Sequence, residues 1–117
     1  MGASIIWFKD IKENENAFVN GYYEPTAYFS SLKMSFSYTT MSKFCNYCLK
    51  NDIAVYELFP YAYSGEFNFL KEDVEKQTNY PPELKEKAKK LENDYYKEIL
   101  QRIIKKLEDG YYIGFLD

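Results

Sequence analysis

The C-terminal stretch of residues 81–110 is the part of the sequence that most constrains the fold. Apolar side chains recur there every three or four residues, so they share one face of a predicted helix. The members of this stripe are Leu84, Ala88, Leu91, Tyr95, Ile99, Ile103 and Leu107. Pro81 suits the first helical turn, and Gly110 suits the position after the last turn. The pattern predicts one long helix between these two residues.

The stripe of this predicted helix is wider in its second half, where Tyr96, Leu100 and Ile104 join it. We therefore expect the second half to be a core helix and the first half to be a solvated arm. A helix of this length spans roughly 43 Å, whereas a compact domain of this size is about 35 Å across. The helix is expected to overhang the body, bend or meet a partner, and a homodimer through it is left open.

Shorter elements are predicted before and after the long helix from turn signals and from the spacing of apolar residues. The predicted strands are 4–8, 32–38, 53–59 and 111–116, with a hairpin turn at Asn20-Gly21. The predicted helices are 41–49, capped by Thr39 or Thr40, and 69–77. Strand, helix and strand over 32–59 predict a compact βαβ-like unit, and the final strand is expected to join the sheet centrally or beside 53–59.

These elements predict a single α+β domain over residues 1–117. We expect a mixed sheet of four or five strands, with helices mainly on one face and the long C-terminal helix followed by a final strand. A chain of 117 residues suits one domain.

Composition narrows the classes of function. The net charge of −3 disfavours binding to nucleic acid, and the absence of histidine removes the commonest general base and zinc ligand. We see no apolar run long enough to span a bilayer and no secretory leader, so no membrane contact and a cytoplasmic location are expected. No cofactor is predicted.

Cys45 and Cys48 form a CxxC motif. A redox pair of this kind lies at a helix N-terminus, where the helix dipole lowers the thiol pKa. Here the predicted helix has already run for about a turn, and both sulfurs share the face of Met41, Phe44 and Leu49. We predict that both cysteines belong to the core. A redox role, or a metal shared across a dimer, is the alternative.

Carboxylates offer a second enzymatic alternative. Glu57 and Glu66 bracket an aromatic loop, Pro60 to Gly65, and are the two acids considered near a pocket. Nothing in the sequence places two carboxylates at the distance from each other that a hydrolase with paired carboxylates needs. The enzyme hypothesis therefore depends on either this pair or the two cysteines.

Thirteen tyrosines are more than one small core accommodates, so some are expected at the surface. Tyrosine is enriched in the cores of protein interfaces. We predict a protein-binding surface on the aromatic loop together with the first half of the long helix, whose acids would steer a basic partner. Its residues are Phe59, Tyr61, Tyr63, Glu83, Glu86, Glu92 and Asp94.

The function expected from these features is non-enzymatic inhibition by binding another protein. The type of protein expected is an antagonist of a bacterial defence protein, encoded by a phage or mobile element. An immunity protein that neutralises a toxin is the nearest alternative, and the small enzyme described above is another. A single-stranded nucleic-acid binder that stacks bases on tyrosines is disfavoured by the acidic charge.

Overall fold

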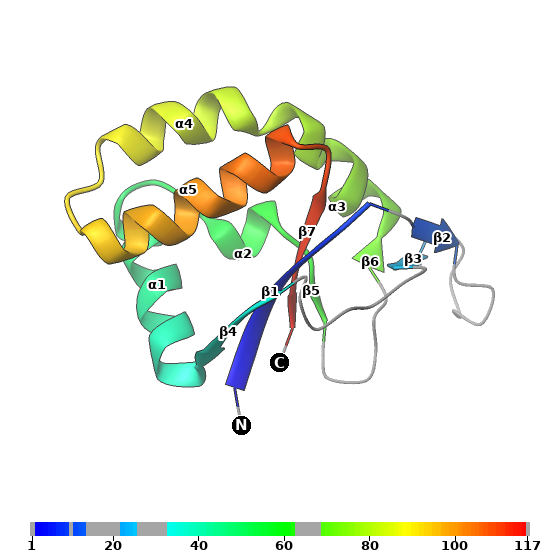
Figure 1. Ribbon diagram of the computed structural model, residues 1–117, viewed down its shortest axis with the longest axis horizontal. Helices are drawn as coiled ribbons and strands as arrows, with labels where there is room; N and C mark the ends of the chain where they lie inside the picture. The colour runs from blue at the N-terminus through cyan, green and yellow to red at the C-terminus, as the bar shows by residue number, and fades with distance from the viewer. Residues whose placement is uncertain (1, 10, 14–21, 26–32, 63–68, 117) are drawn as a thin grey trace.

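The computed structural model describes the chain except residues 1, 10, 14–21, 26–32, 63–68 and 117 (Figure 1). Its strands are β1 (Gly2–Phe8), β2 (Ile11–Glu13), β3 (Tyr22–Pro25), β4 (Lys33–Ser37), β5 (Tyr61–Ala62), β6 (Phe69–Leu70) and β7 (Tyr112–Leu116). Its helices are α1 (Tyr38–Lys50), α2 (Val55–Leu58), α3 (Lys71–Glu75), a 3₁₀ helix (Lys76–Asn79), α4 (Pro81–Lys89) and α5 (Asp94–Glu108). The α+β class predicted from the sequence is confirmed.

The main sheet has the strand order β4-β1-β7-β5. β1 is antiparallel to both of its neighbours, and Ile5 lies opposite Met34 on β4 and Phe115 on β7. β5 adds two residues parallel to the end of β7. The final strand of the chain therefore lies inside the sheet, as its sequence predicted.

A second sheet, with the order β2-β3-β6, lies at the end of the molecule near α3 (Figure 1). The sequence predicted one mixed sheet of four or five strands and did not predict this division of the strands between two sheets. β3 contains Tyr22 and Tyr23 from the predicted hairpin. The hairpin turn itself, Asn20-Gly21, falls outside the described residues.

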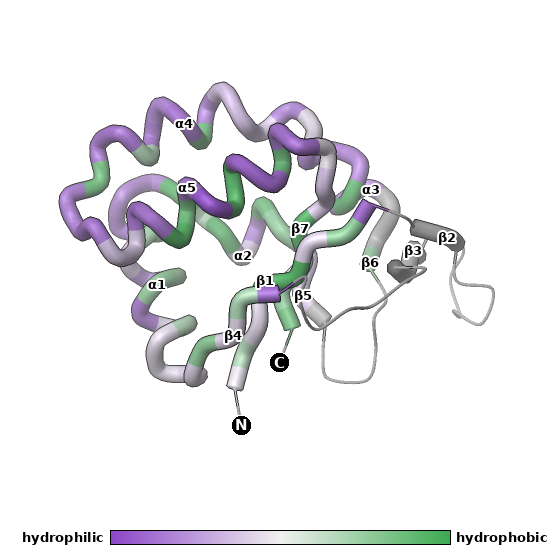
Figure 2. Tube along the Cα trace, viewed as in Figure 1, coloured by the Kyte–Doolittle hydropathy of each residue, from purple (hydrophilic) through white to green (hydrophobic). Residues whose placement is uncertain are grey.

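The alternation of side chains along β1 separates two hydrophobic cores. Ile5 and Trp7 belong to the large core, which the main sheet shares with α1, α2, α4 and α5. Ile6 and Phe8 point to the opposite face of the strand. They belong to a small core whose other members are Phe69, Val74 and Leu116. Figure 2 shows β1 and β7 as mostly hydrophobic, whereas α4 is mainly hydrophilic with isolated hydrophobic positions.

The single long helix predicted between Pro81 and Gly110 is wrong. The chain reverses at residues 90–93, so α4 and α5 pack side by side instead of forming one rod (Figure 1). Asn93 caps α5 by accepting a hydrogen bond from the Tyr96 amide at 3.0 Å. The Tyr47 hydroxyl accepts hydrogen bonds from the amides of Glu92 and Asn93, at 3.0 and 2.9 Å.

The reversal also removes the solvated arm. Leu84 on α4 is as buried as Ile103 on α5, with 3% and 0% of each residue exposed. The overhang that left a homodimer open does not exist, because α4 folds back over the body of the molecule (Figure 1).

The predicted strand 53–59 is instead occupied by the short helix α2, Val55–Leu58, so the βαβ-like unit is also wrong. Asp52 precedes it with φ 64°, a left-handed conformation that turns the chain sharply after α1. Val55 and Phe59 are both buried, and their spacing of four residues is compatible with a helical turn as well as with a strand. A short run of apolar residues does not distinguish the two structures by its periodicity.

The remaining boundaries differ in detail from those predicted. The N-cap of α1 is Ser37, whose hydroxyl accepts from the Thr40 amide at 3.1 Å, and not Thr39 or Thr40. One helix was predicted over 69–77. In the structure the first two of these residues form β6, and the others belong to α3 and the 3₁₀ helix.

Candidate functional site

The two cysteines lie inside the large core. Cys45 and Cys48 on α1 are 1% and 0% exposed, so the prediction that they belong to the core is confirmed. Burial raises the pKa of the Cys45 thiol, and burial together with the neighbouring Cys45 raises the pKa of Cys48 to about 12. Because the thiolate is the reactive form, neither residue has the properties of a redox or metal-binding cysteine.

The structure does not test the carboxylate alternative, Glu57 with Glu66. Glu57 lies exposed on α2, and Glu66 falls outside the described residues. Among the residues that the structure describes, no group of three histidine, cysteine, aspartate or glutamate side chains is placed to hold a metal ion.

The aromatic part of the predicted binding surface is rearranged in the structure. Phe59 is only 2% exposed, so its assignment to the surface is wrong. Its ring packs against those of Phe115 and Tyr80, with centroid separations of 5.8 and 5.7 Å. Tyr61 is 40% exposed in β5, at the edge of the main sheet. Tyr63 falls outside the described residues.

Tyr56 is a surface residue that sequence reasoning missed. It projects from α2, is 55% exposed, and meets the Tyr61 ring edge to face with centroids 6.3 Å apart. We call Tyr56 and Tyr61 the tyrosine pair. The assignment of 53–59 to a strand concealed the pair, because a strand would have carried Tyr56 away from the loop as part of the sheet.

The acids of the predicted surface are all exposed, but they do not form one acidic patch. Glu83 pairs with Lys87 at 3.1 Å, and Glu86 pairs with Lys89 at 3.0 Å. Glu92 lies in the turn after α4, and Asp94 is the first residue of α5. Residues 81–109 contain eight basic and seven acidic side chains, so this region has no excess of negative charge.

One of these acids, Glu83, lies close to α2, the helix that carries Tyr56. A pocket of about 160 Å³ between α2 and α4 is lined by Leu58, Glu83 and Lys87, among others. Lys87 donates to the Asp52 carbonyl at 2.7 Å and thereby ties α4 to the turn before α2. Its hydrogen bond with Glu83, followed by the charge of Asp52, raises the pKa of Lys87. Lys87 thus ties the turn at Asp52 to α4.

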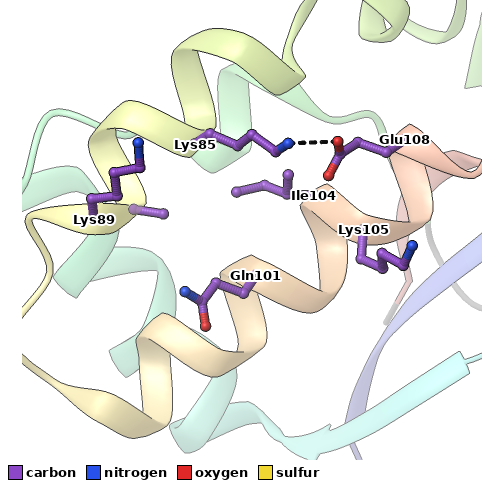
Figure 3. Close-up of a pocket in the computed structure, with 7 residues that line it drawn as sticks. Lys85, Lys89, Gln101, Ile104, Lys105 and Glu108 are labelled. Carbon is purple, nitrogen blue, oxygen red and sulfur yellow. Dashed lines mark ion pairs between the residues drawn. The ribbon is translucent and has the colours of Figure 1, made fainter.

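A second hollow, of about 410 Å³, lies between α4 and α5. It is lined by Lys85, Ala88, Lys89, Gln101, Ile104, Lys105 and Glu108 (Figure 3). None of these positions was singled out as a site from the sequence, because a single continuous helix would not have enclosed a groove.

The geometry defines a small α+β protein with the tyrosine pair on its surface and a lysine-lined groove between two helices. Comparison with models of protein families, with curated proteins and with solved structures finds no match to this chain. Within the described part of the chain, no helix has the length and apolar character needed to cross a bilayer.

Proposed function

We propose that this protein binds another protein through the tyrosine pair and acts as a non-enzymatic inhibitor of that partner. The observation that supports the proposal is the pairing of two exposed tyrosines from different elements, α2 and β5. Tyrosine supplies a large contact area and a polar hydroxyl, and fixing its ring costs little conformational entropy. Such residues supply much of the binding energy in protein interfaces.

The backbone between Tyr56 and Tyr61 is anchored in the core, which favours a binding role for the tyrosine pair. Phe59, which lies between Tyr56 and Tyr61 in sequence, is clamped in the core by Phe115 and Tyr80. The Phe115 amide also donates to the Pro60 carbonyl at 2.9 Å. A surface that is ordered before binding loses less entropy when the partner docks.

The finer form of the proposal is an antagonist of a bacterial defence protein, encoded by a phage or mobile element. It rests on small size, net acidity, abundant tyrosine and a lysine-biased composition with one arginine. A toxin-neutralising immunity protein has the same features and differs in its target. The net charge of −3 also favours a partner with a basic surface. The excess of acidic residues lies outside α4 and α5, because lysines balance the acids of these two helices.

The test uses tagged full-length protein to capture partners from lysates of candidate hosts, with mass spectrometry to identify them. Purified partner is then titrated by calorimetry with wild-type protein, Tyr56→Ala, Tyr61→Ala and the control Tyr95→Ala. We expect each tyrosine-pair variant to lose about 1–3 kcal/mol of binding free energy. Tyr95 is equally exposed but lies at the start of α5, so its variant should bind normally.

Melting temperatures decide how a loss of binding is interpreted. Tyr56 also hydrogen-bonds the side chain of Cys45, so Tyr56→Phe is included to separate the hydroxyl from the ring. Normal binding by Tyr61→Ala and Tyr56→Ala defeats the proposal. Unfolding of both variants defeats it as well, because the rings would then serve the stability of the domain.

A further inference from the structure

The pocket between α2 and α4 has an apolar wall that remains accessible to solvent. Ala54, Leu58 and Tyr80 line it, and all three are half-buried, so each keeps surface that a ligand can cover. Leu84 on α4 also lines the pocket and is buried. An apolar group that enters the pocket would therefore meet apolar side chains from both helices.

The wall of the pocket is held in place by contacts with the rest of the fold. Ala54 and Leu58 are four residues apart, so they lie on the same side of α2. The Tyr80 ring packs edge to face against the buried Phe59 ring, with centroids 5.7 Å apart. Lys87 ties the turn before α2 to α4. A pocket that is formed before binding loses little entropy when it is filled.

The rim of the pocket carries more negative than positive charge. The carboxylates of Asp52 and Glu83 belong to side chains that are 96% and 73% exposed. Among the described residues that line the pocket, Lys87 is the only cation, at 3.4 and 3.1 Å from these carboxylates. A carboxylate offers about four acceptor sites. Both acids can therefore bind a second cation while they keep Lys87.

The volume of the pocket decides what kind of ligand it fits. Small-molecule sites usually enclose about 300–1,000 Å³, whereas this pocket has about 160 Å³. A cavity of about 150 Å³ holds one benzene molecule. The pocket therefore fits a single apolar side chain and is too small for a whole ligand of ordinary size. Side chains that fill pockets are frequent hot spots of protein interfaces.

The pocket and Tyr56 lie on opposite flanks of the same short helix. Tyr56 is two residues from both Ala54 and Leu58, which places it about 200° around α2 from Ala54. A helix is only about 10 Å wide with its side chains, and a standard interface covers about 800 Å² on each partner. One partner that covers α2 would therefore reach the pocket and the tyrosine pair together.

We propose that the protein partner inserts one apolar side chain of about leucine size into this pocket, next to a lysine or arginine. The apolar side chain packs between Leu58 and Leu84, and the neighbouring cation binds Asp52 and Glu83. This inference rests on the proposed protein binding through the tyrosine pair, and it names the chemistry by which the partner is recognised beside that pair.

The experiment titrates ¹⁵N-labelled full-length protein with capped tripeptides as probes. Lysine-leucine-lysine should give saturable shifts of the amide signals of Ala54, Leu58 and Leu84. Lysine-alanine-lysine should bind roughly tenfold more weakly, because a methyl group buries much less apolar surface than a leucine side chain. Glutamate-leucine-glutamate should also bind more weakly than the first peptide, because its charges face the acids of the rim.

Two matched double variants test the role of the rim. Asp52→Asn with Glu83→Gln should weaken binding of lysine-leucine-lysine about threefold or more, because two exposed charge contacts are lost. Asparagine tolerates the left-handed conformation of residue 52, and the backbone carbonyl there still accepts from Lys87. Glu92→Gln with Glu98→Gln removes the same charge at exposed positions outside the pocket and should bind the peptide normally.

A filled pocket tests the apolar contact. Ala54→Leu should place its own side chain in the pocket and abolish the shifts at Leu58 and Leu84. Ser42→Leu adds the same side chain at an exposed position of α1 that does not line the pocket, so it should leave binding unchanged. Circular dichroism shows whether each variant is folded, and the peptide series in the wild type tests the pocket independently of the variants.

The inference fails if lysine-leucine-lysine gives no saturable shifts at the pocket, if the alanine peptide binds as tightly, or if both double variants bind equally. Any of these results leaves the proposed function intact, provided that Tyr56→Ala and Tyr61→Ala weaken binding of the purified partner. Normal partner binding by those two variants, together with selective binding of the leucine peptide, would instead defeat the role of the tyrosine pair and support the pocket as the docking site.

Discussion

Gln77 is the one buried polar side chain among the residues that the structure describes. Its amide group donates to the Ile113 carbonyl at 2.8 Å and accepts from the Ile113 amide at 2.7 Å. β5 pairs only with the end of β7, at Phe115 and Leu116. Gln77 thus supplies, from a 3₁₀ helix, the hydrogen bonds that a neighbouring strand would otherwise make.

Gln77→Leu should destabilise the fold by roughly 2–4 kcal/mol, because it leaves the amide and carbonyl of Ile113 buried without partners. Chemical denaturation measures the loss, and Thr78→Ala provides an exposed control that should change stability little. Gln77→Glu sharpens the test, because an ionised carboxylate accepts but cannot donate. Its stability should improve as the pH falls. A loss under 1 kcal/mol for Gln77→Leu would show that water satisfies Ile113.

Ionisation of the Cys48 thiol should lower the stability of the fold at alkaline pH. Its pKa is about 12 in the folded protein against an ordinary value of 9.0, chiefly because it is buried. Since the folded pKa is the higher one, this contribution is complete below pH 9 and is lost as the pH rises towards 12. The loss amounts to at most about 1.4 kcal/mol per pH unit in that range.

The difference in unfolding free energy between wild type and Cys48→Ala isolates this effect, because lysines and tyrosines titrate equally in both proteins. The difference should be constant from pH 7 to about 9 and then shrink towards pH 10.5. A difference that stays constant would mean that the thiol ionises equally in both states. Rapid reaction of folded protein with a thiol reagent at neutral pH would contradict its burial.

At the scale of the elements, the turn between α4 and α5 decides the shape of the C-terminal half. The Tyr47 hydroxyl accepts from both Glu92 and Asn93, and the Asn93 side chain caps the helix that follows. Tyr47 reaches the turn from α1, and its ring also packs at a tilt of 37° against Tyr96, with centroids 5.1 Å apart. Tyr47 and Asn93 together therefore fix where α5 begins.

Tyr47→Phe should cost about 1 kcal/mol, because two partly solvated amides lose one shared acceptor. Hydrogen exchange should also become faster at Glu92 and Asn93 than elsewhere. Asn93→Ala should cost a similar amount through loss of the cap. Tyr95→Phe is the control, since no hydrogen bond of its hydroxyl belongs to this turn. Unchanged exchange at the two amides in Tyr47→Phe would show that the turn holds without the hydroxyl.

The sequence contained a signal for this turn, but the apolar spacing masked it. Leu91, Tyr95 and Ile99 follow one another at steps of four, so the stripe appears to continue through a break of the helix. Asn93 followed by Asp94 is a typical helix start, with a capping side chain and an acid in the first turn. The Tyr47 contact is separated from the turn by about 45 residues of sequence, so no local pattern predicts it.

The candidate sites show the same division between local and long-range information. The burial of Cys45 and Cys48 followed from helical spacing alone, and the structure confirmed it. The exposed position of Tyr61 was also anticipated. The groove between α4 and α5 was not, because it requires two helices to fold against each other. Phe59 was placed wrongly because its ring packs in the core against Tyr80 and Phe115, which lie far from it in the sequence.

At the scale of the whole molecule, the main sheet separates two cores of unequal size. The large core contains most of the buried side chains and joins the sheet to α1, α2, α4 and α5. The small core comprises Ile6, Phe8, Phe69, Val74 and Leu116. Gly114 adapts β7 to the small core, since a Cβ there would lie 2.6 Å from Phe69 Cζ. Gln77 links α3 to the sheet beside this core, because its side-chain amide donates to the Asp73 carbonyl on α3 and to the Ile113 carbonyl on β7.

We predict that the side of α3 and β6 opens locally before the rest of the protein unfolds. Fewer apolar side chains stabilise that side, and the free energy of local opening follows the amount of buried contact. Native-state hydrogen exchange at low denaturant should give a lower opening free energy for the amides of Val74 and Gln77 than for Leu100 and Ile103. Gln77→Leu should lower the opening free energy of Val74 more than that of Leu100, because it removes the link between α3 and β7. Equal opening free energies at all four amides in the wild type would instead mean that the two cores unfold as one cooperative unit.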